Sequence, residues 1–179
     1  MELFDNVQRK VGEDLKGVLK PRSKMSVAAS VFSIYAFEAL RKELSQIEEL
    51  RFIFTSPQFI EEDLVKKSRE FYIPHIVREA ELCGGEFELR LRNQLNQRAI
   101  AEECAAWVKE KVRFKTNRNA MSSIPSMIHV ANSDGEGAVY QNFGEFNAPG
   151  LGFSRKEGHP QCINKFGSEM SQQFLQHFD

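Results

Sequence analysis

Residues 24–56, KMSVAASVFSIYAFEALRKELSQIEELRFIFTS, decide the fold, because strand, helix and strand follow one another there. Residues 24–33 are small or apolar on both faces of an extended pattern, which is typical of a strand buried on both sides. Ser33 can cap a helix over 34–46, and a second apolar strand follows at 50–56. A strand–helix–strand unit of this length predicts two parallel strands.

Three further helices are predicted from apolar residues at helical spacing. The first extends from Phe4 to Leu19 and ends at Pro21, which cannot continue a helix. The second carries Cys104 and Trp107 on its apolar face. The third covers 163–178 at the end of the chain. Its rich apolar face predicts that the chain is part of a longer protein.

The remaining strands are predicted from alternation. In 112–116 the apolar and basic side chains alternate, and residues 126–132 and 138–143 flank the Gly-containing turn SDGEG. Residues 58–96 combine a helical pattern with a run, EFELRLRNQLN, that suits a strand or a helix. The sequence therefore predicts one α/β domain over 1–179, with a mixed β-sheet flanked by helices.

Composition limits the class of protein. The chain has 179 residues, 41% hydrophobic and 27% charged, with a formal net charge of −1, which suits one globular domain. The N-terminus lacks the apolar core of a signal peptide, and no run has the ~18 apolar residues of a membrane span. The three cysteines and four histidines show no metal-ligand spacing. We expect a cytoplasmic protein with reduced thiols, no cofactor and no membrane partner.

Charge is unevenly distributed along the chain. Residues 90–118 contain eight basic and three acidic residues, a net charge of +5, whereas residues 25–89 have a net charge of −5. Two interpretations stay open: a phosphate-binding surface for nucleic acid, DNA before RNA, or solvated faces that pair with the acidic segment. The candidate nucleic-acid-binding residues are Arg90, Arg92, Arg98, Lys111, Arg113, Lys115 and Arg118.

His129 is the candidate for chemistry. A histidine that attacks a phosphodiester needs a neighbouring cation to hold the non-bridging oxygens, and a lysine two residues later on a strand would share its face. That position is Ala131, so the sequence lacks the local cation. Arg113 and Lys115, on the preceding predicted strand, are the nearest replacements, and Glu136 in the turn could orient the histidine.

These residues resemble the phospholipase D superfamily, whose motif is His-x-Lys-x4-Asp-Gly followed by Gly-Ser-x-Asn. His129 matches the histidine, Ala131 stands at the lysine, and Glu136-Gly137 matches Asp-Gly. The resemblance implies a phospholipase D-like half as the fold, and the lost lysine implies that catalysis is lost.

The second part of the motif is degenerate as well. In GEFN, residues 144–147, Gly144 and Asn147 match the pattern and Glu145 replaces the serine, which places an anion where phosphate oxygens would lie. The superfamily joins two copies of the motif across an interface, and this chain shows one. The resemblance therefore implies a homodimer for any working site, with His129, Glu136 and Asn147 as its degenerate catalytic residues.

A broader resemblance involves SVAASVFSIYAFEALRKEL, LRFIFTSPQFIEE, REFYIP, LRNQLNQRAIAEECAAWVKEKVRFKTN and INKFGSEMSQQFLQHFD. These segments look like the N-terminal region of large bacterial helicase-related ATPases, in which a phospholipase D-like domain precedes the motor. The chain contains no Gly-x-x-x-x-Gly-Lys-[Ser/Thr] phosphate loop, so it carries no motor of its own.

We therefore expect a nucleic-acid-binding accessory domain of a helicase-like ATPase that is not an active enzyme. A metal-independent phosphodiesterase or nuclease using His129 is the first alternative. A protein-interaction module is the second, favoured by the apolar C-terminal helix.

Overall fold

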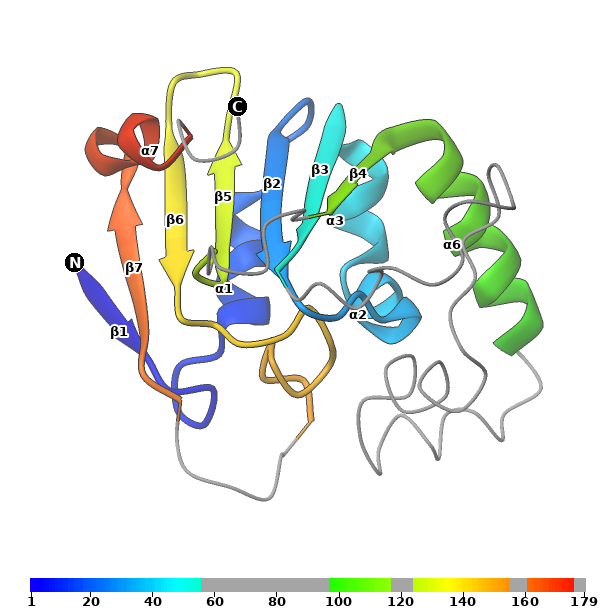
Figure 1. The fold of residues 1–179 in the computed structure, drawn as a ribbon, viewed down its shortest axis with the longest axis horizontal. Coiled ribbons are helices and arrows are strands. Elements are labelled where there is room, and N and C mark those ends of the chain that lie inside the picture. Colours follow the sequence, from blue (N-terminus) through cyan, green and yellow to red (C-terminus); the bar gives the residue numbers. More distant parts are fainter. Residues whose placement is uncertain (56–96, 117–123, 155–160, 176–179) are drawn as a thin grey trace.

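The computed structural model of the protein describes residues 1–55, 97–116, 124–154 and 161–175. The predicted fold class is confirmed: these residues form a seven-stranded mixed β-sheet flanked by helices (Figure 1). The strand order is β1-β7-β6-β5-β2-β3-β4. The predicted segment 58–96 lies outside the described residues.

The strands are β1 (Glu2–Phe4), β2 (Lys24–Ala29), β3 (Glu49–Phe54), β4 (Val112–Thr116), β5 (Met127–Ala131), β6 (Gly137–Gln141) and β7 (Ile163–Gly167). The helices are α1 (Val11–Val18), α2 (Ile34–Ala39), α3 (Arg41–Gln46), α6 (Gln97–Lys111) and α7 (Ser168–Leu175). Among the described helices, none is long and apolar enough to cross a membrane.

The strand–helix–strand unit forms as predicted. β2 and β3 are parallel, with Ser26 opposite Arg51, and β4 adds a third parallel strand beside β3. Ser33 caps α2 because its Oγ accepts a hydrogen bond from the Tyr35 amide at 3.2 Å. The predicted helix over 34–46 is divided at Leu40, whose φ of −112° and ψ of 14° interrupt the helix between α2 and α3.

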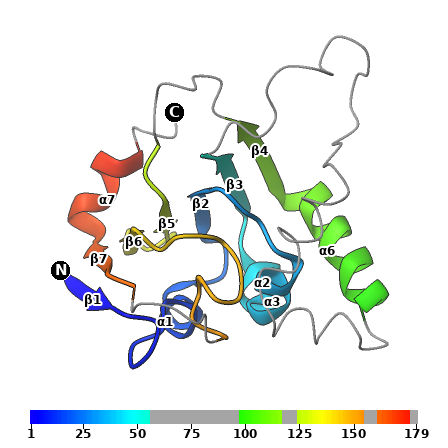
Figure 2. The ribbon, with the colours of Figure 1, turned by 60° about the horizontal axis from the view of Figure 1, so that its bottom comes forward.

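One face of the sheet, the helix face, carries the main core. Figure 2 shows α1, α2, α3 and α6 on this side of the strands and α7 on the other. Strand residues such as Val27, Phe52 and Val130 pack there against helix residues such as Leu15 and Phe37. Since side chains alternate along a strand, every second strand residue contributes to this core.

The opposite face, the α7 face, carries the alternate strand residues. α7 packs against β5, β6 and β7 on this side. Ala28, Ile53 and Met127 form a second, smaller apolar cluster there. The hairpin of β5 and β6 is antiparallel, as predicted, and β5 also pairs antiparallel with β2.

Two predicted helices are wrong in part. Residues 2–4 form β1 and the first helix begins at Val11, so the helical spacing predicted from Phe4 is broken. Residues 163–167 form β7, which pairs with both β6 and β1, and the C-terminal helix begins only at Ser168. In both segments, pairing with a distant strand overrides the local pattern.

Candidate functional site

His129 is the middle residue of β5, and its neighbours come from the strands on either side. Its register partners are Ser26 on β2 and Val139 on β6. Its side chain lies on the α7 face and is buried, with 1% of its surface exposed. The predicted shared face of His129 and Ala131 follows from the strand that the structure shows here.

A row of polar side chains crosses the sheet at His129. We call His129, Ser26 and Arg51, on β5, β2 and β3, the polar row, because the strand registers place them side by side. Arg51 Nε donates a hydrogen bond to the buried Ser26 hydroxyl at 3.1 Å. The polar row therefore brings a guanidinium within two strands of His129, in an otherwise apolar part of the face.

The cations nearest to Ala131 differ from the expected ones. β2 and β3 separate β5 from β4, so Arg113 and Lys115 are not the nearest replacements for the missing lysine. Lys24 on β2 lies opposite Ala131 in the register and belongs to the same face. Its Nζ pairs with Glu48 at 3.1 Å, and both side chains are more than half exposed.

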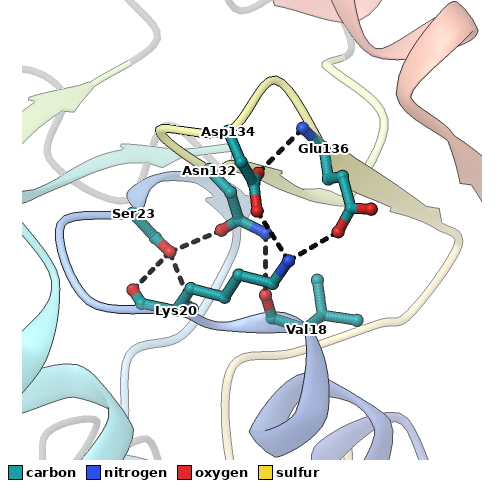
Figure 3. Close-up of polar contacts among 6 residues, drawn as sticks. All are labelled: Val18, Lys20, Ser23, Asn132, Asp134 and Glu136. Carbon is teal, nitrogen blue, oxygen red and sulfur yellow. Dashed lines mark hydrogen bonds and ion pairs between the residues drawn. The ribbon is translucent and has the colours of Figure 1, made fainter.

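Glu136 lies in the turn between β5 and β6 and pairs with a lysine from another loop. Lys20 Nζ lies 2.5 Å from a Glu136 carboxylate oxygen and 2.6 Å from an Asp134 oxygen (Figure 3). Those two acids raise the pKa of Lys20 to about 12, and Lys20 in turn lowers the pKa of Asp134. The ion pair of Glu136 with Lys20 thus links the turn between β5 and β6 to the loop after α1.

Buried polar groups strengthen the same junction. Asn132 Nδ2 donates to the Val18 carbonyl at 3.0 Å, and Asn132 Oδ1 lies 2.5 Å from the Ser23 hydroxyl (Figure 3). The Lys20 amide donates to that same hydroxyl at 2.8 Å. These hydrogen bonds give Asn132 and Ser23 partners within the fold, so we interpret both residues as stabilising this junction.

Asn147 lies in the loop after β6 and is buried. Its Oδ1 accepts a hydrogen bond from the Gly150 amide at 2.7 Å, and its Nδ2 donates to the Glu145 carboxylate at 2.6 Å. Gly144, before it, has a φ of +86°, a conformation that favours glycine. The GEFN segment is therefore a turn stabilised by the hydrogen bonds of Asn147, one of which is accepted by the Glu145 carboxylate.

The structure does not bring the three predicted catalytic residues together. Glu136 precedes β6 and Asn147 follows it, on either side of a five-residue strand. Such a strand is roughly 15 Å long, at about 3.3 Å per residue. His129 lies midway along the neighbouring strand, whereas Glu136 contacts Lys20 and Asn147 contacts Gly150.

A second cluster lies at the β4 end of the sheet. We call Arg51, Arg113 and Lys115 the basic edge: Arg51 and Arg113 are register partners, and all three belong to the α7 face. The Arg113 side chain is 76% exposed, and its Nε lies 3.8 Å from Glu49 Oε1. The Lys115 side chain is also exposed. Among the described strands, β4 is the last on this side.

The other predicted nucleic-acid-binding residues are placed apart from the basic edge or outside the described part of the chain. Lys111, at the end of α6, donates to the carbonyls of Ser45 and Ile47, both at 2.8 Å. Arg98 lies in the first turn of α6. The structure does not describe Arg90, Arg92 and Arg118.

Ser26, Arg51 and Lys24 were missed because each lies within a strand predicted to be buried. The available signal was the polar residue in each apolar run: serine in KMSVAA and arginine in ELRFIF. Only the register shows that these positions meet beside His129.

Other chemistry has little geometric support among the described residues. No group of three or more His, Cys, Asp or Glu side chains there could hold a metal ion. Burial raises the pKa of the Cys104 thiol to about 12, so it is protonated and unreactive at neutral pH.

Comparison with protein-family models and with curated protein sequences finds no match to the chain.

Proposed function

We propose that the protein is a cytoplasmic nucleic-acid-binding accessory domain of a helicase-like ATPase, phospholipase D-like in fold and catalytically inactive. It binds the phosphate backbone of DNA with its basic edge, without reading the base sequence. The motor would be supplied by another part of a longer protein or by a partner chain.

The observation that carries this proposal is the convergence of Arg51, Arg113 and Lys115 on one face of adjacent parallel strands. Alternate residues of one strand are about 7 Å apart, which is close to the phosphate spacing of an extended nucleic-acid strand. Arg113 and Lys115 are exposed, so they can contact phosphates without a rearrangement of the core. Glu49 beside Arg113 reduces the positive potential there, and the described residues of the cluster keep a net positive charge.

Two placements support inactivity. Ala131 contributes no cation beside His129, and the groups that would complete the motif are engaged elsewhere: Glu136 with Lys20, and Asn147 with Gly150. His129 itself is buried. A binding role uses the exposed cations and does not need this histidine.

The test is fluorescence anisotropy of labelled single- and double-stranded DNA over a salt series. The double variant Arg113→Glu, Lys115→Glu should bind about 10-fold or more weakly at low salt. Its slope of log affinity against log salt should be shallower by roughly 1.4 to 1.8, since two phosphate contacts are lost.

A matched control reverses two charges on the helix layer instead. Lys42 on α3 and Lys109 on α6 are exposed, so Lys42→Glu, Lys109→Glu makes the same change in net charge without touching the basic edge. We expect its affinity to stay closer to that of the wild type at each salt concentration. Equal losses in both double variants would show a non-specific charge effect and count against the basic edge.

One observation favours a second candidate, a metal-independent phosphodiesterase. The polar row places the Arg51 guanidinium on the same face as His129, where it could replace the cation missing at Ala131. In this function His129 would attack phosphorus and displace one alcohol, and water would then release the phosphate monoester from the histidine, while Arg51 would hold the non-bridging oxygens.

The phosphodiesterase is tested with a model phosphodiester in the presence of EDTA. Turnover that is abolished in both His129→Gln and Arg51→Gln, with folding retained by circular dichroism, would establish it. If the wild type shows no turnover above buffer, or if turnover survives His129→Gln, this candidate fails. Neither result affects the binding test, which uses Arg113 and Lys115.

A further inference from the structure

The exposed large apolar side chains of the described residues concentrate at the β1 end of the sheet. Met1, Leu3 and Val7 are 88%, 53% and 62% exposed, and the fourth, Met170, is 39% exposed. Met170 lies in the first turn of α7, which directly follows β7, the partner strand of β1. A concentration of apolar surface at one edge is typical of a contact with another protein.

The same end of the sheet has an edge strand, β1, in the part of the chain that the structure describes. Among the described strands β1 is the last on its side, and an edge strand presents unpaired amide and carbonyl groups. Lysine, proline, a bulge, a short length or a charged side chain commonly blocks such an edge. β1, with the sequence ELF, lacks the first three, but it is three residues long and carries Glu2. Leu3 lies on the α7 face, and Glu2 and Phe4 lie on the helix face.

Charge makes this edge complementary to itself. The Arg9 guanidinium lies 4.5 Å from the centroid of the Phe4 ring and pairs with Glu2 of its own chain. Lys165 Nζ lies 5.9 Å from the same ring. If two β1 strands pair antiparallel about Leu3, Glu2 of one copy lies opposite Phe4 of the other. The incoming carboxylate then meets Arg9, whereas Lys165 stays paired with Asp14, and symmetry produces the Arg9 contact twice.

We propose that a second copy of this chain docks on β1, by antiparallel pairing of the two β1 strands about a two-fold axis at Leu3. The two sheets join into one continuous sheet, which is an isologous contact. Leu3 packs against Leu3 of the second copy on the α7 face. β4 is at the opposite end of the sheet, so the dimer presents one basic edge at each of its far ends. The docking does not depend on nucleic-acid binding.

Cysteine cross-linking tests the register directly. In a background with Cys83 and Cys162 replaced by serine, Leu3→Cys places two thiols on opposing residues, whose Cα atoms would be about 4.5–5.5 Å apart, within disulfide range. We expect this variant to form a covalent dimer under mild oxidation. Glu2→Cys is the matched control, because its counterpart is Phe4. Equal cross-linking of both variants would indicate random collision and overturn the proposed register.

A charge-exchange experiment tests the same surface without cysteines. In Arg9→Glu alone the incoming Glu2 meets a glutamate, and in Glu2→Arg alone the incoming arginine meets Arg9, so each variant should sediment as a monomer where the wild type is dimeric. An equimolar mixture restores both opposite-charge contacts and should form a heterodimer. A wild type that stays monomeric over the whole concentration series, or a mixture that stays monomeric, would overturn the proposal.

Discussion

Asp14 on α1 joins two strands through one carboxylate. The buried Tyr140 on β6 donates its hydroxyl to Asp14 Oδ2, and Lys165 Nζ on β7 lies 2.7 Å from the same oxygen. The Lys165 and Asp14 side chains are only 16% and 25% exposed. Burial and the Asp14 carboxylate raise the pKa of Tyr140, so the phenol remains a donor at neutral pH.

Removing the tyrosine hydroxyl and removing the aspartate carboxylate should lower the free energy of unfolding by different amounts. Tyr140→Phe removes one hydrogen bond and leaves Asp14 paired with Lys165, so we expect a loss of about 1 kcal/mol in the free energy of unfolding. Asp14→Ala leaves a mostly buried ammonium and a buried hydroxyl without their acceptor, and should cost about 2–3 kcal/mol. Urea unfolding measures both. Equal costs would mean that the Lys165 pair contributes nothing.

Lys20 predicts a dependence of stability on pH. The folded pKa of Lys20 is raised to about 12, so its contribution is present at neutral pH and is lost as the pH rises through that value. The folded pKa of Asp134 is lowered, so its contribution is complete above the ordinary value of 3.8 and is lost as the pH falls through the depressed value.

Lys20→Met should therefore lower the melting temperature at neutral pH, and the difference from wild type should shrink as the pH falls through the depressed pKa of Asp134. Differential scanning fluorimetry over a pH series measures this difference. Lys42→Met is the control, since the structure gives Lys42 no ion pair among the described residues. A difference that persists unchanged at acidic pH would show that Lys20 acts through packing.

At the level of single residues, the sequence identifies His129 but not the neighbours it acquires. Residue spacing predicts that His129 and Ala131 share a face, because alternation along a strand is local. Ser26 and Arg51 meet His129 only through the strand order β5-β2-β3, which brings together segments far apart in the chain. Glu136 and Asn147 are drawn away by local hydrogen bonds that motif spacing does not reveal.

At the level of elements, Lys111 links α6 to α3, although the sequence predicted that it binds nucleic acid. Lys111 Nζ donates to the Ser45 and Ile47 carbonyls, which lie at the end of α3. Lys111→Met keeps most of the side chain but loses both charge-assisted hydrogen bonds, so we expect a loss of about 1–2 kcal/mol in unfolding free energy.

Lys109→Met provides the comparison for this element. Lys109 is exposed on the same helix, and a change there should alter stability by less than about 0.5 kcal/mol. Chemical denaturation of the two variants measures the difference. Lys111 would revert to a candidate phosphate ligand if Lys111→Met matched the wild type in stability and weakened DNA binding.

Elements whose apolar pattern is bounded by a cap or a turn were predicted correctly. The edge strand β1 and its neighbour β7 were not. The unit from β2 to β3 and the hairpin of β5 and β6 have apolar patterns bounded by caps or turns. β7 was mistaken for helix because Ile163 and Phe166 are three residues apart, as on a helix face. In a strand they lie on opposite faces, and Ile163 joins the core of the helix face.

β1 is too short for periodicity to reveal. It has three residues, and its pairing with Lys165, Asn164 and Ile163 comes from the other end of the chain. Long-range pairing of this kind has no local sequence signal, which is why strand propensity depends on context.

At the level of the whole molecule, the described residues separate two kinds of surface. The basic edge lies on β3 and β4 at one end of the sheet, and the exposed apolar residues lie at β1, the loop after it and the first turn of α7 at the other end. The helix layer and the strands between them share one main apolar core, which reaches from Phe4 on β1 to Val112 on β4. A shared core predicts that both ends of the sheet unfold together.

Trp107, the only tryptophan, provides the probe for this prediction. It is buried, its Nε1 donates to the Leu44 carbonyl at 2.9 Å, and its ring centroid lies 5.0 Å from that of Phe37. Its fluorescence therefore reports on α6 and its packing, whereas far-UV circular dichroism reports on all elements. In urea the two transitions should coincide at one midpoint.

Tyr140→Phe makes the test stricter, because Tyr140 lies on β6 and contacts α1, away from Trp107. If the core is one cooperative unit, this distant change must shift the Trp107 fluorescence midpoint as far as the circular dichroism midpoint. A fluorescence midpoint that stays at the wild-type urea concentration while the circular dichroism midpoint falls would mean that the two ends unfold independently. Nucleic-acid binding at β4 would then be unable to stabilise the β1 edge, since stabilisation by a ligand extends only over the unit that unfolds with its site.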